Sequence, residues 1–119
     1  MARAVPPDDI APHVFFTQWL PEVVRGDRER RERLAGTAAT LAFELLGDGG
    51  GHFHLRVEAG EVRGYAGRAQ SADLWVSVDL ESWRALNAGT LSAPEALLRQ
   101  RVRLSGDLTL AVKLHLIIG

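Results

Sequence analysis

The chain opens with hydrophobic residues at a helical period. They recur at spacings of one, three and four residues, which predicts one heavy apolar stripe along a helix. The stripe consists of Phe15, Phe16, Trp19 and Leu20. Asp9 is expected to cap this helix and Pro12 to lie in its first turn, because aspartate accepts from free backbone amides and proline lacks one. Pro21 is expected to break or restart the helix.

A run of charges of alternating sign covers residues 25–33. The sum of its charges is almost neutral, which favours a solvated helical face, with a docking patch as the alternative. Asp27 is a suitable N-cap for a new helix, and Gly36 a suitable end.

After Gly36 the hydrophobic period changes from helical to two, which predicts strands with one apolar face each. The expected strands cover residues 39–45, 52–58, 62–67 and 73–79. The connections contain glycine and aspartate, as tight turns do. Strands in sequence with short turns predict an antiparallel meander that is covered on one side.

Helical signals return in the last third of the chain. A short helix is expected over 80–88, with Asp79 as its cap and Gly89 at its end. A second helix is expected to begin at Ser92, with a proline in its first turn, and a fifth strand to cover 101–104. The final segment, 108–118, has only three polar residues, so as a helix it is expected to be buried or to face apolar groups on both sides.

Length and charge limit the functional classes. The 119 residues suit a single domain at 10–119, with a flexible leader at 1–9. The formal charge is −1, so no overall positive field attracts nucleic acid. The chain has no cysteine, which excludes disulfides, thiolate metal sites and cysteine catalysis. No segment is as long and apolar as a membrane span or a signal peptide, so a cytoplasmic location is expected.

The candidate catalytic groups have simpler explanations. His52 and His54 share a strand face and could hold a metal, but no third ligand lies nearby in the sequence, so a solvated strand face is favoured. The glycines at 49–51 are followed by no Lys-Ser/Thr pair and no helix, which favours a hairpin turn over a phosphate loop. We therefore expect no catalytic residue, no metal site and no cofactor.

The chain has more bulky apolar side chains than one face of a small sheet would be expected to cover. Either ordinary core packing absorbs them, or they line an apolar cavity that a lipid fills. The pattern alone leaves both alternatives open.

Three blocks in the second half of the chain are more specific than composition: residues 79–89 (DLESWRALNAG), 92–98 (SAPEALL) and 101–111 (RVRLSGDLTLA). With these blocks, the chain resembles the sterol carrier protein type-2 domain family. The sharpest part is the Gly-Asp-Leu at 106–108, and the order of elements also agrees from Phe15 to Ile118. One departure is Gln100, where such proteins often carry glycine, which predicts a different turn there.

The resemblance implies an α+β fold: a five-stranded, mostly antiparallel sheet with helices packed on one face around an apolar tunnel. It implies a non-catalytic carrier of a fatty acid, sterol or related lipid. Such a carrier is expected to make transient contact with a membrane, and from the charge we expect no nucleic-acid partner. The expected wall includes the final helix, the Trp83 helix and the inward strand residues. The expected ligand contacts are Phe15, Phe16, Trp19, Phe43, Trp83, Leu86, Leu97, Leu98, Leu108, Ala111, Val112 and Leu116. The alternative function is a dimerisation or accessory module for a lipid- or quinone-metabolising partner, with a collapsed cavity and the last helix as a homodimer interface.

Overall fold

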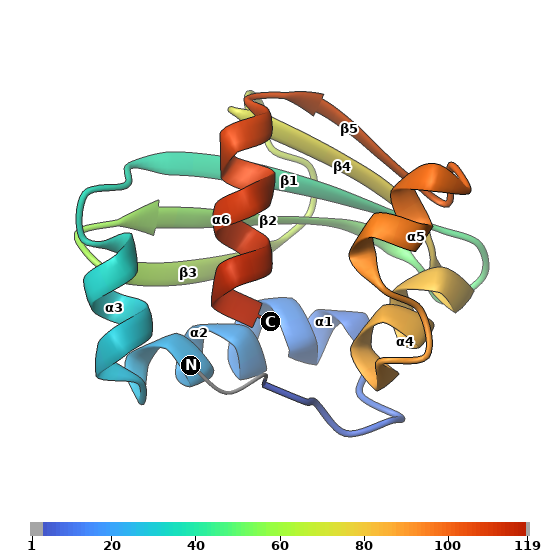
Figure 1. The fold of residues 1–119 in the computed structure, drawn as a ribbon, viewed down its shortest axis with the longest axis horizontal. Coiled ribbons are helices and arrows are strands. Elements are labelled where there is room, and N and C mark those ends of the chain that lie inside the picture. The colour runs from blue at the N-terminus through green and yellow to red at the C-terminus, as the bar shows by residue number, and fades with distance from the viewer. Residues whose placement is uncertain (1–3, 119) are drawn as a thin grey trace.

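A mixed sheet of five strands forms one layer of the structure, in the order β3-β2-β1-β4-β5 (Figure 1). The computed structural model describes residues 4–118, and of 116–118 only the backbone. The strands are β1 (Ala39–Leu46), β2 (Gly51–Glu58), β3 (Glu61–Ala66), β4 (Leu74–Asp79) and β5 (Val102–Gly106). The pairs β1–β2, β2–β3 and β4–β5 are antiparallel, whereas β1 and β4 are parallel. The expected α+β class with a mostly antiparallel sheet is confirmed.

The expected four-strand meander is wrong at its last step. Strands β1, β2 and β3 do form a meander, but β4 pairs with β1 and not with β3. The loop at 67–73 carries the chain back across the sheet to reach that position. Alternation of apolar residues identifies a strand but does not select its neighbour, so the crossover could not be read from the pattern.

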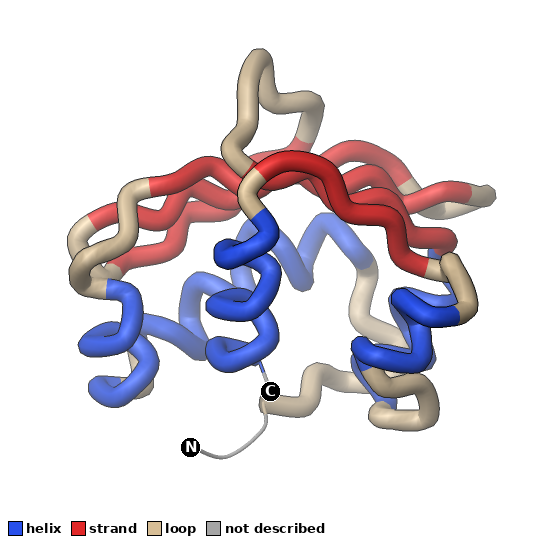
Figure 2. Tube along the Cα trace, turned by 45° about the horizontal axis from the view of Figure 1, so that its top comes forward, coloured by secondary structure: helices blue, strands red, loops and turns tan. Residues whose placement is uncertain are grey.

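The helices all lie on one side of the sheet (Figure 2). They are α1 (Pro12–Val14), the π-helical turn η1 (Phe15–Trp19), α2 (Leu20–Arg25), α3 (Arg28–Leu34), α4 (Leu80–Ala88), α5 (Ala93–Leu98) and α6 (Leu108–Ile118). The apolar faces of the strands point toward these helices, and the core lies between them. Buried residues of the sheet in this core include Leu41, Phe43, Leu55, Leu74 and Val78.

The N-terminal helix runs through a π-helical turn and into α2. The Leu20 amide donates to the Phe15 carbonyl, and Pro21 lies in the first turn of α2. Proline therefore begins a new helical segment there, and the helix is not interrupted by a loop. The expected capping by Asp9 is wrong, because Ala11 occupies the N-cap position and no side chain caps the helix.

Glycine at position 64 lets this helix approach the sheet closely. A Cβ on Gly64 of β3 would lie 1.7 Å from the Phe16 carbonyl oxygen and 2.6 Å from its carbon. Both atoms belong to the backbone, so a side-chain rotation could not relieve the clash. The absence of a side chain at Gly64 therefore sets how deeply the phenylalanines of η1 enter the core.

Most of the other predicted caps are confirmed. Asp27, Asp79 and Ser92 each accept from backbone amides at the start of α3, α4 and α5. Gly89 ends α4 in the left-handed conformation, with φ of 81°. Gln100 also adopts a left-handed conformation, with φ of 58°, so the turn before β5 is kept although glycine is absent.

The charged run is largely a solvated helical face, with one exception. Arg30 is buried, and its guanidinium pairs with the Asp27 carboxylate.

The N-terminal segment before α1 contacts the rest of the structure. From residue 4 onward it includes a buried Pro6, and Arg84 of α4 donates to the carbonyls of Asp8 and Ile10 at 3.1 Å each. The flexibility expected for residues 1–9 stays a prediction, and its first three residues lie outside the described range.

Candidate functional site

A cavity of about 420 Å³ lies between the inner face of the sheet and the helices. Its walls come from η1, α2, β1, β4, β5, α4, α5 and α6, so elements from both halves of the chain enclose it. The lining is almost entirely apolar, with polar side chains contributed by Asn87, Ser92 and His115. The apolar side chains of the lining are Ala4, Phe15, Phe16, Leu20, Phe43, Leu74, Val76, Val78, Trp83, Leu86, Leu91, Ala93, Leu97, Val102, Leu104, Ala111 and Leu114.

Aromatic side chains form one wall of this cavity. The Phe15 ring meets the Trp83 ring edge to face, with centroids 5.2 Å apart. The Phe16 ring lies 4.8 Å from the Phe43 ring and stacks on Phe53 at 4.9 Å. These contacts fix the orientation of large apolar surfaces that face the cavity.

A partly buried network of hydrogen bonds positions α4, which carries Trp83 and Leu86. Asp79 accepts from the Ser82 amide at 2.9 Å and from the Ser82 hydroxyl at 2.5 Å. The Ser82 oxygen in turn accepts from the Arg101 Nε at 2.7 Å. Ser82 is fully buried, and its hydroxyl, together with its amide, holds the pKa of Asp79 below its ordinary value against the opposing effect of burial. These hydrogen bonds link the end of β4, the first turn of α4 and the start of β5.

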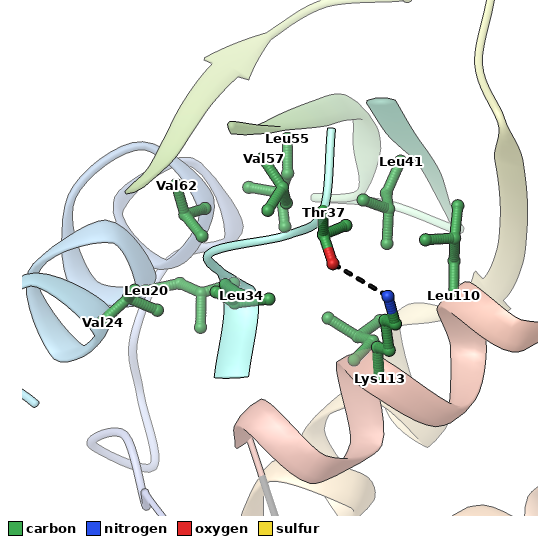
Figure 3. A pocket seen from close by; sticks show the side chains of 11 residues that line it. Leu20, Val24, Leu34, Thr37, Leu41, Leu55, Val57, Val62, Leu110 and Lys113 are labelled. Atoms are coloured by element: carbon green, nitrogen blue, oxygen red, sulfur yellow. Dashed lines mark hydrogen bonds between the residues drawn. The ribbon is translucent and has the colours of Figure 1, made fainter. Parts of the chain in front are cut away.

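Helix α6 supplies the wall opposite the sheet through Ala111, Leu114 and His115. The same helix faces a second, much smaller cavity of about 20 Å³ toward α2 and α3 (Figure 3). There the Lys113 Nζ donates to the Thr37 Oγ1 at 2.9 Å, among leucines and valines of the core (Figure 3). Leu20 and Leu114 line both cavities, so the two cavities are neighbours.

The structure brings seven of the sequence-predicted contact residues to the large cavity. They are Phe15, Phe16, Phe43, Trp83, Leu86, Leu97 and Ala111. Whether they contact a ligand stays a prediction.

Of the five remaining predicted contacts, four do not line this cavity. Trp19 is partly buried and stacks on Phe15 at 5.3 Å, behind the aromatic wall. Leu98, Leu108 and Val112 are 85%, 57% and 61% exposed on α5 and α6. The side chain of Leu116 lies outside the described residues.

The ligand contacts predicted from the sequence did not include several residues that line the cavity. Leu74, Val76 and Val78 alternate along β4 and form part of the wall that was expected only in general terms, as inward strand residues. Val102 and Leu104 follow the same alternation on β5. The polar lining residues Asn87 and His115 had no signal in the sequence, because nothing in the pattern fixes the rotation of α4 and α6 about their axes.

The histidine pair lies on the helix-free face of the sheet, away from the cavity. The His52 Nε2 lies 3.7 Å from a Glu44 carboxylate oxygen, and the His54 Nδ1 lies 3.0 Å from the Gly67 carbonyl. In the described part of the chain, no three His, Asp or Glu side chains gather as a metal site would require. Within the same residues, no helix has the length and apolar character needed to cross a membrane.

The family model of the SCP-2 sterol transfer family matches residues 16–118. This chain belongs to the SCP-2 sterol transfer family. The match covers nearly all of the cavity-lining elements and confirms the resemblance seen in the sequence. No curated protein matches the chain significantly.

Solved structures of this fold come from proteins with different activities. The sec-alkylsulfatase Pisa1 from Pseudomonas sp. is 23% identical with a TM-score of 0.71, covering 92% of this chain and 16% of the sulfatase. Palmitated SCP2L2 from Aedes aegypti is 24% identical with a TM-score of 0.57, covering 82% and 92% of the two chains. The ubiquinone synthesis protein UbiJ-SCP2 is 15% identical with a TM-score of 0.66, covering 89% and 91%. At these identities the likeness shows the fold alone, and the chain spans only about a sixth of the sulfatase's length.

Proposed function

We propose that this SCP-2 family member is a lipid carrier that holds a fatty acid, sterol or related lipid in its large cavity. The observation that carries the proposal is the cavity itself. Its volume of about 420 Å³ lies within the range of roughly 300–1,000 Å³ that is typical of small-molecule sites. Its lining is apolar apart from three side chains, so water gains little by occupying it.

Transfer of hydrocarbon from water supplies the affinity. Each buried methylene contributes about 0.8 kcal/mol, so a long acyl chain gains on the order of 10 kcal/mol before the costs of ordering and association. The walls offer bulk and few hydrogen-bonding groups, which favours a broad choice of apolar ligands. The palmitated state of the Aedes aegypti neighbour supports a fatty acid as one such ligand.

Exposed leucines and a valine beside the cavity suggest how a ligand is exchanged. Leu97 of α5 lines the cavity, and the next residue, Leu98, is 85% exposed. Leu108 and Val112 extend the apolar surface on α6. We assign these side chains to transient contact with a membrane from which the lipid is withdrawn.

Tryptophan fluorescence tests the proposal. A Trp19→Phe/Trp75→Phe variant keeps Trp83 in the cavity wall, and a Trp19→Phe/Trp83→Phe variant keeps only the exposed Trp75 as the matched control. Titration with palmitate or cholesterol is expected to change the emission of Trp83 and to displace a bound fluorescent fatty acid. Unchanged Trp83 emission, without displacement, would count decisively against the carrier.

A dimerisation or accessory module is the second candidate. The exposed Leu108 and Val112 on α6 favour it, and so does the likeness to UbiJ-SCP2, a ubiquinone synthesis protein. Size-exclusion mass with and without detergent separates the two candidates. A monomer that co-purifies with lipid supports the carrier, whereas an obligate dimer without ligand supports the module.

The absence of catalysis and the cytoplasmic location expected from the sequence stay predictions. The carrier proposal needs no reacting group, because the function consists of binding and release. An assay of lipid transfer between vesicles in which the lipid is recovered chemically unchanged tests the first prediction, and cell fractionation tests the second.

A further inference from the structure

The helix-free face of the sheet carries a second cleft, of about 310 Å³. The loop at 67–73 rises on this face, opposite the helices (Figure 2), and contributes Arg68 and Ala69 to the cleft. The loop is anchored at both ends. The Gly67 amide donates to the His52 carbonyl at 2.8 Å, and Asp73 exchanges two hydrogen bonds of 2.8 Å with Thr40. The cleft is therefore a feature of the folded sheet and an anchored loop.

Strand register brings the floor of the cleft together from four strands. His52, Glu44, Ser77 and Arg103 are successive partners across β2, β1, β4 and β5, so they form one row. The neighbouring row places Ala42 beside Trp75, and both residues line the cleft. Trp75 lines the cleft and is 43% exposed, so part of its indole surface is open to contact with a ligand.

Some charged side chains in the cleft have polar partners, and others have none. Glu44 lies beside His52 and accepts from the Ser77 hydroxyl at 3.3 Å. Within the residues that the structure describes, the guanidinium groups of Arg68 and Arg103 have no ion-pair or hydrogen-bond partner. Two unpaired guanidinium groups and one carboxylate leave the cleft with an excess of positive charge when His52 is neutral.

We propose that this cleft binds a small organic anion that carries a planar ring. Its carboxylate or phosphate would be bound by Arg68 and Arg103, because guanidinium groups match the geometry of both anions. Its ring would stack on Trp75, since an exposed indole face favours offset contact with another ring. The cleft volume suits a ligand at the small end of the usual range. This site lies on the opposite side of the sheet from the lipid cavity, and the inference does not depend on the carrier function.

Titrations followed by the protein's backbone amide NMR signals test this proposal with three probes. The probes are 2-naphthoate, adenosine monophosphate and the neutral 2-naphthylmethanol. At least one of the two anions is expected to bind about tenfold or more tightly than the neutral probe, with saturable shifts at residues 68, 69, 75, 77, 103 and 105. The stronger of the two anions shows whether carboxylate or phosphate is preferred.

Variants show which side chains hold the anion. Arg68→Ala/Arg103→Ala and Trp75→Ala are each expected to weaken binding about tenfold or more. Arg63→Ala and Tyr65→Ala are the matched controls, because both residues are exposed on β3 and lie outside the cleft. The proposal is overturned if neither anion binds, if the arginine variant binds as well as the original chain, or if the shifts fall at 15–16 and 111–114 around the inner cavity.

Discussion

Replacing Ala111 with phenylalanine should close part of the large cavity that we propose as the lipid site. Ala111 lies on α6 and lines the cavity, so a phenyl group there points into space that the proposed ligand needs. The ring takes the room of roughly four ligand methylenes, and at about 0.8 kcal/mol each the loss is about 3 kcal/mol. A loss of that size weakens palmitate binding by about 100- to 200-fold.

Displacement of a fluorescent fatty acid measures this loss, and Val112→Phe provides the control. Val112 is the next residue on the same helix but is 61% exposed and does not line the cavity. Its substitution should leave the affinity nearly unchanged. Thermal unfolding should show that Ala111→Phe is at least as stable as the original chain, because the ring fills an existing cavity. Equal affinities of the original chain and Ala111→Phe would refute the reasoning.

Three further predictions concern the framework of the site. Gly64→Ala should lower the free energy of unfolding by about 1–3 kcal/mol in denaturant titrations, because the new Cβ meets the Phe16 carbonyl at 1.7 Å. Gln100→Gly should raise it by about 0.5–1 kcal/mol, since a left-handed residue costs about 1–2 kcal/mol and glycine removes that strain at an entropic cost of about 0.5–1 kcal/mol. The pKa of Asp79 is lowered on folding, so ionised Asp79 stabilises the fold. This stabilisation is complete above about pH 5 and is lost as the pH falls through the lowered pKa. Ser82→Ala should move that loss to higher pH in acid unfolding curves.

Each of these three predictions has a control variant or a result that would contradict it. Gly36→Ala is the control for Gly64→Ala, because a Cβ on Gly36 meets no atom within 4 Å; equal stability losses would contradict the proposed close approach. Gln100→Ala keeps the left-handed strain and should not stabilise the chain; a stabilisation equal to that of Gln100→Gly would show that strain is not the cause. An acid unfolding curve that Ser82→Ala leaves in place would show that the Ser82 hydroxyl does not govern Asp79.

Local features of the fold could be predicted because they depend on near neighbours in the chain. The two-residue period located the strands, and the caps Asp27, Asp79 and Ser92 located helix starts. The parallel pairing of β1 with β4 could not be predicted in this way, since it depends on how the loop at 67–73 crosses the sheet. The length of that loop was the one signal available, because a tight hairpin needs only two to five residues.

The lining of the cavity was only partly predictable for a related reason. Helix α6 is apolar on almost every side, so its sequence does not reveal its rotation. The structure turns Ala111 and Leu114 toward the cavity and leaves Leu108 and Val112 exposed. Bulk and hydrophobicity alone therefore identified residues on both sides of the helix.

Contacts between palmitate and the protein test the lipid carrier most directly. Isotope-filtered NMR with ¹³C-labelled palmitate detects which methyl groups lie within contact distance of the acyl chain. The carrier predicts cross-peaks from mid-chain methylenes to Val76, Leu104 and Leu114 in the cavity wall. Cross-peaks confined to the exposed Leu98, Leu108 and Val112, or no complex at all, would contradict it.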